Sequence, residues 1–406
     1  MPDATWYYTM NWSYSKVITK KELQIVAVLA SIFSLRMLGL CMLLPIFATE
    51  ALRYTHATAP LIGLAVGIYG LAQAVLQVPF GMLSDKYGRK PLILVGLGLI
   101  VFGSLISAMA TSIYGLIIGR ILQGCGAIGS VVIALLADQI REQVRASAMA
   151  ILGASIGLAF ALAFILGPWL NQWVGLSGIF MVIALLAAMG AMLLVTIPKS
   201  TTWQPQPRIA SFSHNLKDML GNYRLLNLNV GVFVLHASLA AMFLVLPGLL
   251  QQAGVIAADL WKLYLVALVV AMLAAWRLIG SSEKRRNTDR LQAIAILGLL
   301  IAEGLLYIVN SWLGIVFSLI IFFTAFCVLE ASLPTLVAKY APASNRGAAL
   351  GMYSCLQFLG MFVGAVVGGW LHGQFSATIV LSFCILLAMG WLLFQTKTTP
   401  VAVGIS

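Results

Sequence analysis

A short charged stretch, residues 81–93, joins two apolar runs of about 20 residues each, long enough to cross a bilayer as helices. It reads Gly-Met-Leu-Ser-Asp-Lys-Tyr-Gly-Arg-Lys-Pro-Leu-Ile and carries one acid and three bases. Asp85 and Arg89 are four residues apart, the spacing at which two side chains meet on a helix and pair. An exposed pair of this kind contributes only about 0–1 kcal/mol. A larger role for it must therefore come from its position between the two runs.

Ionisable side chains also interrupt the apolar runs themselves. They are Arg36, Arg120, His236, Glu303 and Glu330. Charged groups at membrane depth are unfavourable, so they usually face the protein interior or a water-filled cavity and pair with one another. These five positions are therefore candidates for a functional site.

The composition excludes a soluble enzyme. Hydrophobic residues make up 61% of the chain and charged residues 9%, whereas about a quarter of a soluble domain is charged. The apolar runs are long and continuous, unlike the short alternating segments of a membrane barrel. We therefore expect an all-α integral membrane protein. Its net charge of +12 is explained by membrane topology, so no nucleic acid partner is expected.

Histidines and cysteines do not indicate a cofactor. The four histidines are widely scattered, and all five cysteines fall inside apolar runs, so neither a metal site nor a disulfide framework is indicated. The chain also has no glycine-rich nucleotide loop. We expect no metal and no cofactor, and any driving force would come from an ion gradient.

Twelve apolar segments are long enough to span a bilayer as helices. They cover residues 22–50, 57–83, 91–110, 113–138, 145–170, 175–197, 224–253, 258–282, 289–310, 312–338, 345–373 and 376–396. A polar, proline-containing linker divides them into two halves of six. The predicted organisation is a tail (1–21), a six-helix bundle (22–197), the linker (198–223), a second bundle (224–396) and a second tail (397–406).

The two halves echo each other at an offset of about 200 residues. Arg145 aligns with Arg346, and Asp138 aligns with Lys339. A constant offset indicates duplicated bundles related by pseudo-symmetry. Most of the 24 Lys and Arg residues fall on one side of the predicted membrane, which predicts that the linker and both termini are cytoplasmic.

The charged stretch resembles motif A of the major facilitator superfamily, Gly-x-x-x-Asp-x-x-Gly-Arg-Lys between the second and third spans. The matching residues are Gly81, Asp85, Gly88, Arg89 and Lys90. The resemblance implies a transporter with twelve helices in two pseudo-symmetric bundles, which expose a central cavity to each side of the membrane in turn.

The resemblance also implies partners for the two central charges of motif A. The aspartate is expected to face the start of span eleven, near Arg346, where a helix N-terminus favours negative charge. The arginine is expected to meet Asp138 at the end of span four. Together these contacts would close the cytoplasmic side, and the alternative is a simple ion pair without a gating role. The corresponding loop of the second half, 277–290, lacks the pattern, so we expect an asymmetric gate.

The fifth span contains Gly153 and Gly157, followed by Gly167 and Pro168. This pattern resembles motif C of the superfamily, which is associated with antiporters. Small residues at four-residue spacing also let helices approach closely, so helix packing is the alternative explanation.

In the superfamily, spans 1, 2, 4, 5, 7, 8, 10 and 11 line the central cavity. This favours Arg36, Arg120, His236 and Glu330 as candidates for proton coupling, whereas a structural or lipid-edge role is expected for Glu303. Arg120 lies in Gly119-Arg-Ile-Leu-Gln-Gly124, which resembles motif B, and the alternative is that it binds helix backbone and orients the bundle. A carboxylate in a low-dielectric cavity favours its neutral form and a nearby arginine opposes this, so Arg36 beside Glu330 is the hypothesis for coupling.

The candidate lining of the cavity is largely apolar. It comprises Phe33, Met37, Tyr69, Gln73, Gln77, Gln123, Met242, Tyr353, Gln357 and Phe358. Such a lining suits an amphipathic small molecule better than a sugar, whose hydroxyls need many hydrogen-bonding partners. Ordinary helix packing is the alternative for each of these residues.

At a finer scale the chain resembles the YajR-type bacterial drug-efflux proton antiporters. The resemblance is carried by residues 33–39, 68–81 and 330–334. It implies a monomer in the bacterial inner membrane, with the bilayer, a small-molecule substrate and protons as partners, that exports amphipathic molecules. The alternatives are a dedicated metabolite or siderophore exporter, a proton-coupled uptake symporter and, from another class, a membrane sensor that does not transport.

Overall fold

The computed structural model describes residues 18–197, 222–285, 288–342 and 346–398. The predicted tails and linker therefore lie almost entirely outside the described residues. Nearly all described residues are helical, and no strand occurs among them. The first half contains α2 (Lys20–Leu43), α3 (Phe47–Glu50), η1 (Ala51–Arg53), α4 (Ala59–Tyr87), α5 (Arg89–Met109), α6 (Ile113–Cys125), α7 (Gly129–Gln139) and α8 (Glu142–Val195). The second half contains α10 (Tyr223–Gln252), η3 (Ala257–Asp259), α11 (Leu260–Arg285), α12 (Thr288–Ile308), α13 (Trp312–Tyr340), α14 (Arg346–Gln374) and α15 (Ala377–Thr398).

Helix α8 resolves the number of membrane passes. Eleven helical segments of the described chain are long and apolar enough to cross a membrane, and α8 is one of them with 54 residues. A helix of that length extends about 80 Å, more than twice the apolar thickness of a bilayer. Gly175 has φ 63° and ψ −176° and breaks the helix. The break divides α8 into two passes, so the predicted all-α fold with twelve passes is confirmed.

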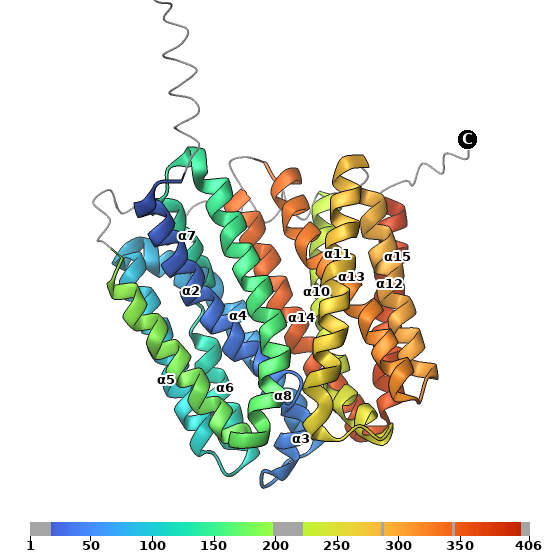
Figure 1. Ribbon diagram of the computed structural model, residues 1–406. Helices are drawn as coiled ribbons and strands as arrows, with labels where there is room; N and C mark the ends of the chain where they lie inside the picture. Colours follow the sequence, from blue (N-terminus) through green and yellow to red (C-terminus); the bar gives the residue numbers. More distant parts are fainter. Residues whose placement is uncertain (1–17, 198–221, 286–287, 343–345, 399–406) are drawn as a thin grey trace, which may run out of the picture.

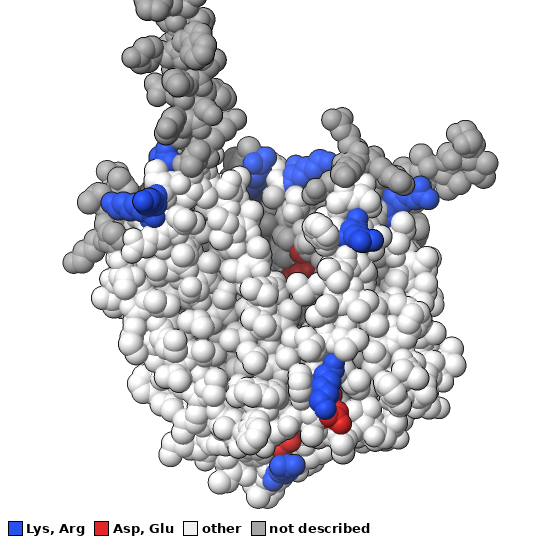
Figure 2. Space-filling model, in the orientation of Figure 1, with Lys and Arg blue, Asp and Glu red and all other residues white. Residues whose placement is uncertain are grey.

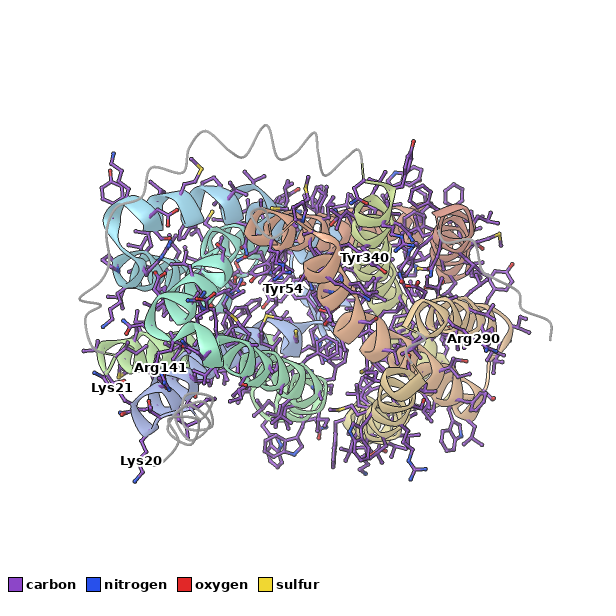
Figure 3. All side chains as sticks on the ribbon, turned by 90° about the horizontal axis from the view of Figure 1, so that it is seen from above. Lys20, Lys21, Tyr54, Arg141, Arg290 and Tyr340 are labelled. Carbon is purple, nitrogen blue, oxygen red and sulfur yellow. The ribbon has the colours of Figure 1, made fainter. Side chains whose placement is uncertain are left out.

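The two halves lie side by side, with α4 and α14 at the centre of the molecule (Figure 1). Lys20, Lys21 and Arg141 lie on one half, and Arg290 and Tyr340 lie on the other, when the molecule is seen from above (Figure 3). These residues belong to the end of the molecule at the top of Figure 1, which we call the basic end. The opposite end carries α3, η1 and η3, and we call it the short-loop end.

The two halves contact each other in two places, which we call seams. Both seams lie between the middle of the molecule and the short-loop end. At the first seam α4 and α14 touch through backbone: a Cβ at Gly63 would lie 2.3 Å from the carbonyl oxygen of Ala365. At the second seam Phe164 of α8 meets Phe243 of α10 and Phe323 of α13, with ring centroids 5.0 and 5.5 Å apart. Towards the basic end, the space-filling view shows a hollow between the halves with acidic atoms inside it (Figure 2).

Candidate functional site

The motif A residues form a charged cluster at the basic end of the first half. Gly88 has φ 96°, which lets the chain turn sharply between α4 and α5 and places Arg89 at the first position of α5. The Arg89 guanidinium lies 2.5 Å from Asp85 Oδ1 and 3.1 Å from Asp138 Oδ2. It also donates a hydrogen bond of 2.6 Å to Ser84 Oγ, a partner that the motif did not predict. This cluster ties α4, α5 and α7 together.

The rest of motif A supports the same junction. The Lys90 ammonium donates to the carbonyl oxygen of Ile197 at the end of α8. Gly81 lies beside Ser130 of α7, since a Cβ there would be 3.6 Å from Ser130 Oγ.

Arg346, at the first position of α14, is exposed, and among the described residues it makes no ion pair with Asp85. The contact implied between Asp85 and the start of α14 stays a prediction for a state with a closed basic end. In this structure that end is hollow, and Asp85 pairs within its own half.

Arg120 is buried and satisfied by helix α4. Its Nε donates to Ala65 O (3.2 Å) and its Nη2 to Val66 O (3.4 Å), while Nη1 donates to Gln123 Oε1 (2.9 Å). The guanidinium also stacks over the Tyr69 ring, 4.7 Å from its centroid. These are the contacts of an arginine that orients the bundle, as the alternative interpretation states.

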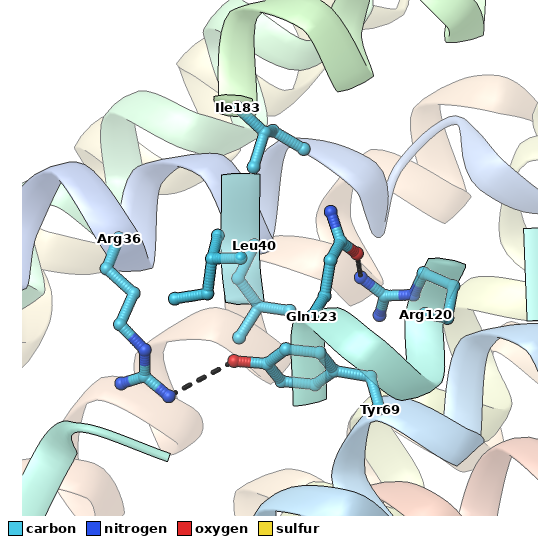
Figure 4. A pocket seen from close by; sticks show the side chains of 7 residues that line it. Arg36, Leu40, Tyr69, Arg120, Gln123 and Ile183 are labelled. Carbon is cyan, nitrogen blue, oxygen red and sulfur yellow. Dashed lines mark hydrogen bonds between the residues drawn. The ribbon is translucent and has the colours of Figure 1, made fainter. Parts of the chain in front are cut away.

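Arg36 completes a polar pocket inside the first half. It donates from Nη2 to the Tyr69 hydroxyl (3.1 Å) and lies over the ring of Phe33. Arg36, Tyr69, Arg120 and Gln123 line a cavity of about 10 Å³, room for about one water molecule (Figure 4). Among the described residues Arg36 makes no ion pair with Glu330, and the hypothesis that the two act together in coupling stays a prediction.

Glu330 instead belongs to a cluster in the second half. Gln357 of α14 donates from Nε2 to Glu330 Oε1 of α13 (3.1 Å) and lies 2.8 Å from Nε2 of His236 on α10. His236 Nε2 is 3.7 Å from Glu330 Oε2, and the Glu330 side chain is 38% exposed whereas that of His236 is 7% exposed. His236 Nδ1 lies 3.1 Å from Val232 O. Three helices thus bring two ionisable groups and one amide together, a grouping that spacing along the chain does not predict.

Glu303 lies elsewhere in the second half. It is fully buried in α12, and its carboxylate lies beside the Ser238 side chain of α10. It is therefore not at the lipid edge, and it takes no part in the cluster.

Several predicted cavity residues are packed between helices in this structure. Gln73 is fully buried and donates to Gly126 O (3.3 Å), and Gln123 donates to Ser104 Oγ (2.7 Å). Met242 is fully buried in α10, and Gln77 is also buried. These four side chains therefore lie between helices in this structure, and Gln123 also lines the small cavity beside Arg120.

The remaining cavity candidates differ in their burial and in their contacts. Phe33, Met37 and Gln357 are partly exposed. Phe358 meets Tyr69 across the halves in an edge-to-face contact, with centroids 6.4 Å apart. The buried Tyr353 hydroxyl has no hydrogen-bond partner among the described residues.

The motif C glycines separate into two groups. A Cβ at Gly167, next to Pro168, would lie 2.3 Å from Met42 O, so this glycine is needed for α8 to approach α2. Gly153 and Gly157 are exposed and a Cβ at either would meet nothing within 4 Å. Close packing therefore explains Gly167 and does not explain Gly153 or Gly157 in this state.

Sequence reasoning missed one acid. Glu22 at the start of α2 is buried and binds Arg141 at the joint between α7 and α8. Its position at the end of an apolar run, where an acid is normally solvated, gave no signal. Among the described residues no group of three His, Cys, Asp or Glu side chains could hold a metal ion.

Comparisons with known proteins agree with this architecture. Residues 28–329 match the family described as Major Facilitator Superfamily. The chain is 42% identical over 367 residues to the inner membrane transport protein YajR of Escherichia coli (strain K12), covering 90% of this chain and 81% of that protein. It is 26% identical to the multidrug resistance protein MdtH of Aeromonas salmonicida (strain A449), covering 84% and 85%.

Two solved structures share the fold at low sequence identity. The D-xylose-proton symporter superposes with a TM-score of 0.75 at 17% identity, covering 93% of this chain and 98% of that chain. The human organic anion transporter MFSD10 superposes with a TM-score of 0.69 at 19% identity, covering 92% and 99%.

Proposed function

The chain belongs to the major facilitator superfamily, and we propose that within it the protein is a proton-coupled exporter of amphipathic small molecules. Proteins of this superfamily are transporters and not enzymes, so a catalytic function is excluded. The names of two relatives, an inner membrane transport protein and a multidrug resistance protein, support export from the bacterial inner membrane. The bilayer, the substrate and protons are the proposed partners, the gradient replaces a cofactor, and the protein acts as a monomer.

The orientation follows from charge. Lys20, Lys21, Arg141 and Arg290 mark the basic end, which we assign to the cytoplasm by the positive-inside rule. The hollow at that end then faces the cytoplasm, and the two seams close the periplasmic side. Rocking the halves about these seams would close the basic end and open the other.

The cluster of Glu330, His236 and Gln357 is the observation that carries the proposal. His236 Nδ1 is placed to donate to Val232 O, which leaves Nε2 to accept a hydrogen bond from the Gln357 amide. The same amide donates to Glu330. A proton on Nε2 would meet the amide hydrogens, so protonated His236 requires Gln357 to turn away. The charge of the histidine is thereby linked to the hydrogen bonding of Glu330, a carboxylate that is partly exposed.

This linkage suits exchange of a proton for a substrate. While His236 is neutral, Glu330 accepts from Gln357. Once His236 is protonated and Gln357 turns away, the imidazolium would lie within ion-pair distance of Glu330. A proton carried in on Glu330 from the periplasm could leave through the hollow when the basic end is open. An amphipathic substrate would enter from the same hollow, against Phe33 and Met37.

The test uses purified protein in liposomes with an imposed pH gradient. Accumulation of amphipathic dyes inside inverted vesicles, together with proton release, is expected for the wild type. Glu330→Gln should abolish the dependence of transport on the gradient, and Asp259→Asn, which removes an exposed pair with Lys262 at the short-loop end, should leave it unchanged. Unchanged gradient dependence in Glu330→Gln would remove the proposed coupling.

The direction of transport separates the alternatives. Gradient-driven movement into right-side-out vesicles would indicate the uptake symporter instead. Transport of a single metabolite or siderophore from a broad panel would indicate a dedicated exporter.

A further inference from the structure

Glu22 is a carboxylate held in place by its own helix. It occupies the third position of α2, where Thr19 is the N-cap. The Thr19 backbone amide donates to Glu22 Oε2 (2.9 Å), and the Glu22 amide donates to Thr19 Oγ1 (3.3 Å). This reciprocal capping box fixes the carboxylate, which is only 6% exposed. A charged group at that burial needs a partner.

The partner is Arg141, which binds both oxygens of the carboxylate. Arg141 Nε lies 2.7 Å from Glu22 Oε1 and Nη2 lies 2.9 Å from Oε2, with the backbone amide of Arg141 a further 3.4 Å contact. Two parallel bonds of this type are strong and set the orientation of both groups. The bond to the carboxylate raises the pKa of the Arg141 guanidinium above its ordinary value.

The position of Arg141 gives this contact its importance. Ile140 and Arg141 are extended, with ψ 134° and 145°, and form the joint between α7 and α8. Helix α7 has only 11 residues and is also separated from α6 by residues 126–128, so its placement depends on its two joints. Asp138 lies two residues before Ile140 and receives Arg89 at 3.1 Å.

The Arg89–Asp138 pair needs such support. The Asp138 side chain is 37% exposed, and a pair with an exposed partner contributes little unless its groups are already placed. We propose that Glu22, acting through Arg141, positions Asp138 against Arg89 and thereby sets how readily the basic end closes. The proposal rests on the alternating-access function proposed above, and it makes Glu22 a positioning residue for the gate.

A double-mutant cycle tests the proposal. Glu22→Gln and Asp138→Asn are made singly and together, and transport is measured in liposomes. Each single variant is expected to lower the rate about tenfold, the effect of losing about 1.4 kcal/mol from one charged contact. The double variant should be no slower than Asp138→Asn alone, because both changes act on the same contact. Losses that multiply would overturn the proposal and show that Glu22 only supports the fold.

A second variant guards against misfolding of Glu22→Gln. Arg141→Gln leaves the cap of α2 in place and should show the same lack of additivity with Asp138→Asn. Asp259→Asn serves as the control, since it should change transport neither alone nor in combination with Asp138→Asn.

The distance between spin labels at Tyr87 and Gly347, the basic ends of α4 and α14, separates this inference from the function itself. Glu22→Gln should shift this distance distribution towards the open form to the same extent as Asp138→Asn, whatever the substrate or direction of transport. An unshifted distribution in either variant overturns the inference. Loss of gradient dependence in Glu330→Gln tests the proposed function independently.

Discussion

The two halves are held differently at the basic end. In the first half, acids pair with bases there: Glu22 with Arg141, and Asp85 and Asp138 with Arg89. In the second half, Arg224 and Lys339 lie over the ring of Tyr340, at 5.0 and 5.6 Å from its centroid. Lys339 aligns with Asp138 in the sequence repeat, so a base replaces an acid at the equivalent position. Ion pairs have defined directions and can exchange partners, whereas cations over a ring make a less directional contact.

The two halves also differ in the ionisable side chains of their interiors. The first half contains two guanidinium groups, Arg36 and Arg120, each hydrogen-bonded to its neighbours. The second half contains an imidazole and a carboxylate, His236 and Glu330, which share the Gln357 amide. In the function proposed above, the first half supplies the gate and the second half supplies the proton site.

The largest effect is expected at Asp85. Asp85→Asn removes its pair with Arg89 and the attraction expected to the N-terminus of α14 in the closed state, together about 2 kcal/mol or about 30-fold in transport. Folding should be unaffected, as judged by thermal unfolding in detergent. Lys339→Gln, at the second-half position that aligns with the gate residue Asp138, is the comparison variant and should retain most of the activity. Equal losses in the two variants would contradict an asymmetric gate.

The next prediction compares one glutamine from the interior of each half, Gln357 and Gln123. Gln357→Leu removes the bond to Glu330, and because a hydrogen bond to a charged group contributes about 1.5–3 kcal/mol, the pH profile of transport should change and the rate fall about tenfold. Gln123→Leu removes the partner of Arg120 and should lower the melting temperature while leaving the pH profile in place. If Gln357→Leu keeps the wild-type pH profile, the amide does not link the two ionisable groups.

A third comparison is between Gly63 at the first seam and Gly153 on the exposed face of α8. Gly153→Leu meets open space here, so thermal unfolding should be unchanged, whereas transport should fall about fivefold because overpacking in the closed state costs about 1 kcal/mol. Gly63→Leu would force its side chain into the backbone of α14 and should destabilise the fold. Wild-type transport in Gly153→Leu would mean that no other helix packs against this face of α8 in any state.

The smallest effect is expected at Tyr340. Tyr340→Leu removes the ring beneath Arg224 and Lys339, and contacts of this kind contribute about 0.5–1 kcal/mol at exposed sites. The melting temperature should drop slightly and transport should stay within about twofold of wild type. A loss comparable to that of Asp85→Asn would place a gate in the second half as well.

The sequence by itself determined the helices, the membrane class and the acid–base content of motif A. Length and hydrophobicity act locally, so twelve apolar segments predict twelve passes, and even the break at Gly175 falls where two predicted segments meet. Asp85 and Arg89 are one helical turn apart, so their pairing also follows from local geometry.

Only the tertiary structure decided which distant groups meet. Arg36 binds Tyr69, and Glu330 meets His236 and Gln357, because the rotation of each helix about its axis is set by packing against several neighbours at once. Glu22 binds Arg141, more than a hundred residues away, for the same reason. Helix rotation is a collective property of the bundle, and no single segment of the sequence encodes it.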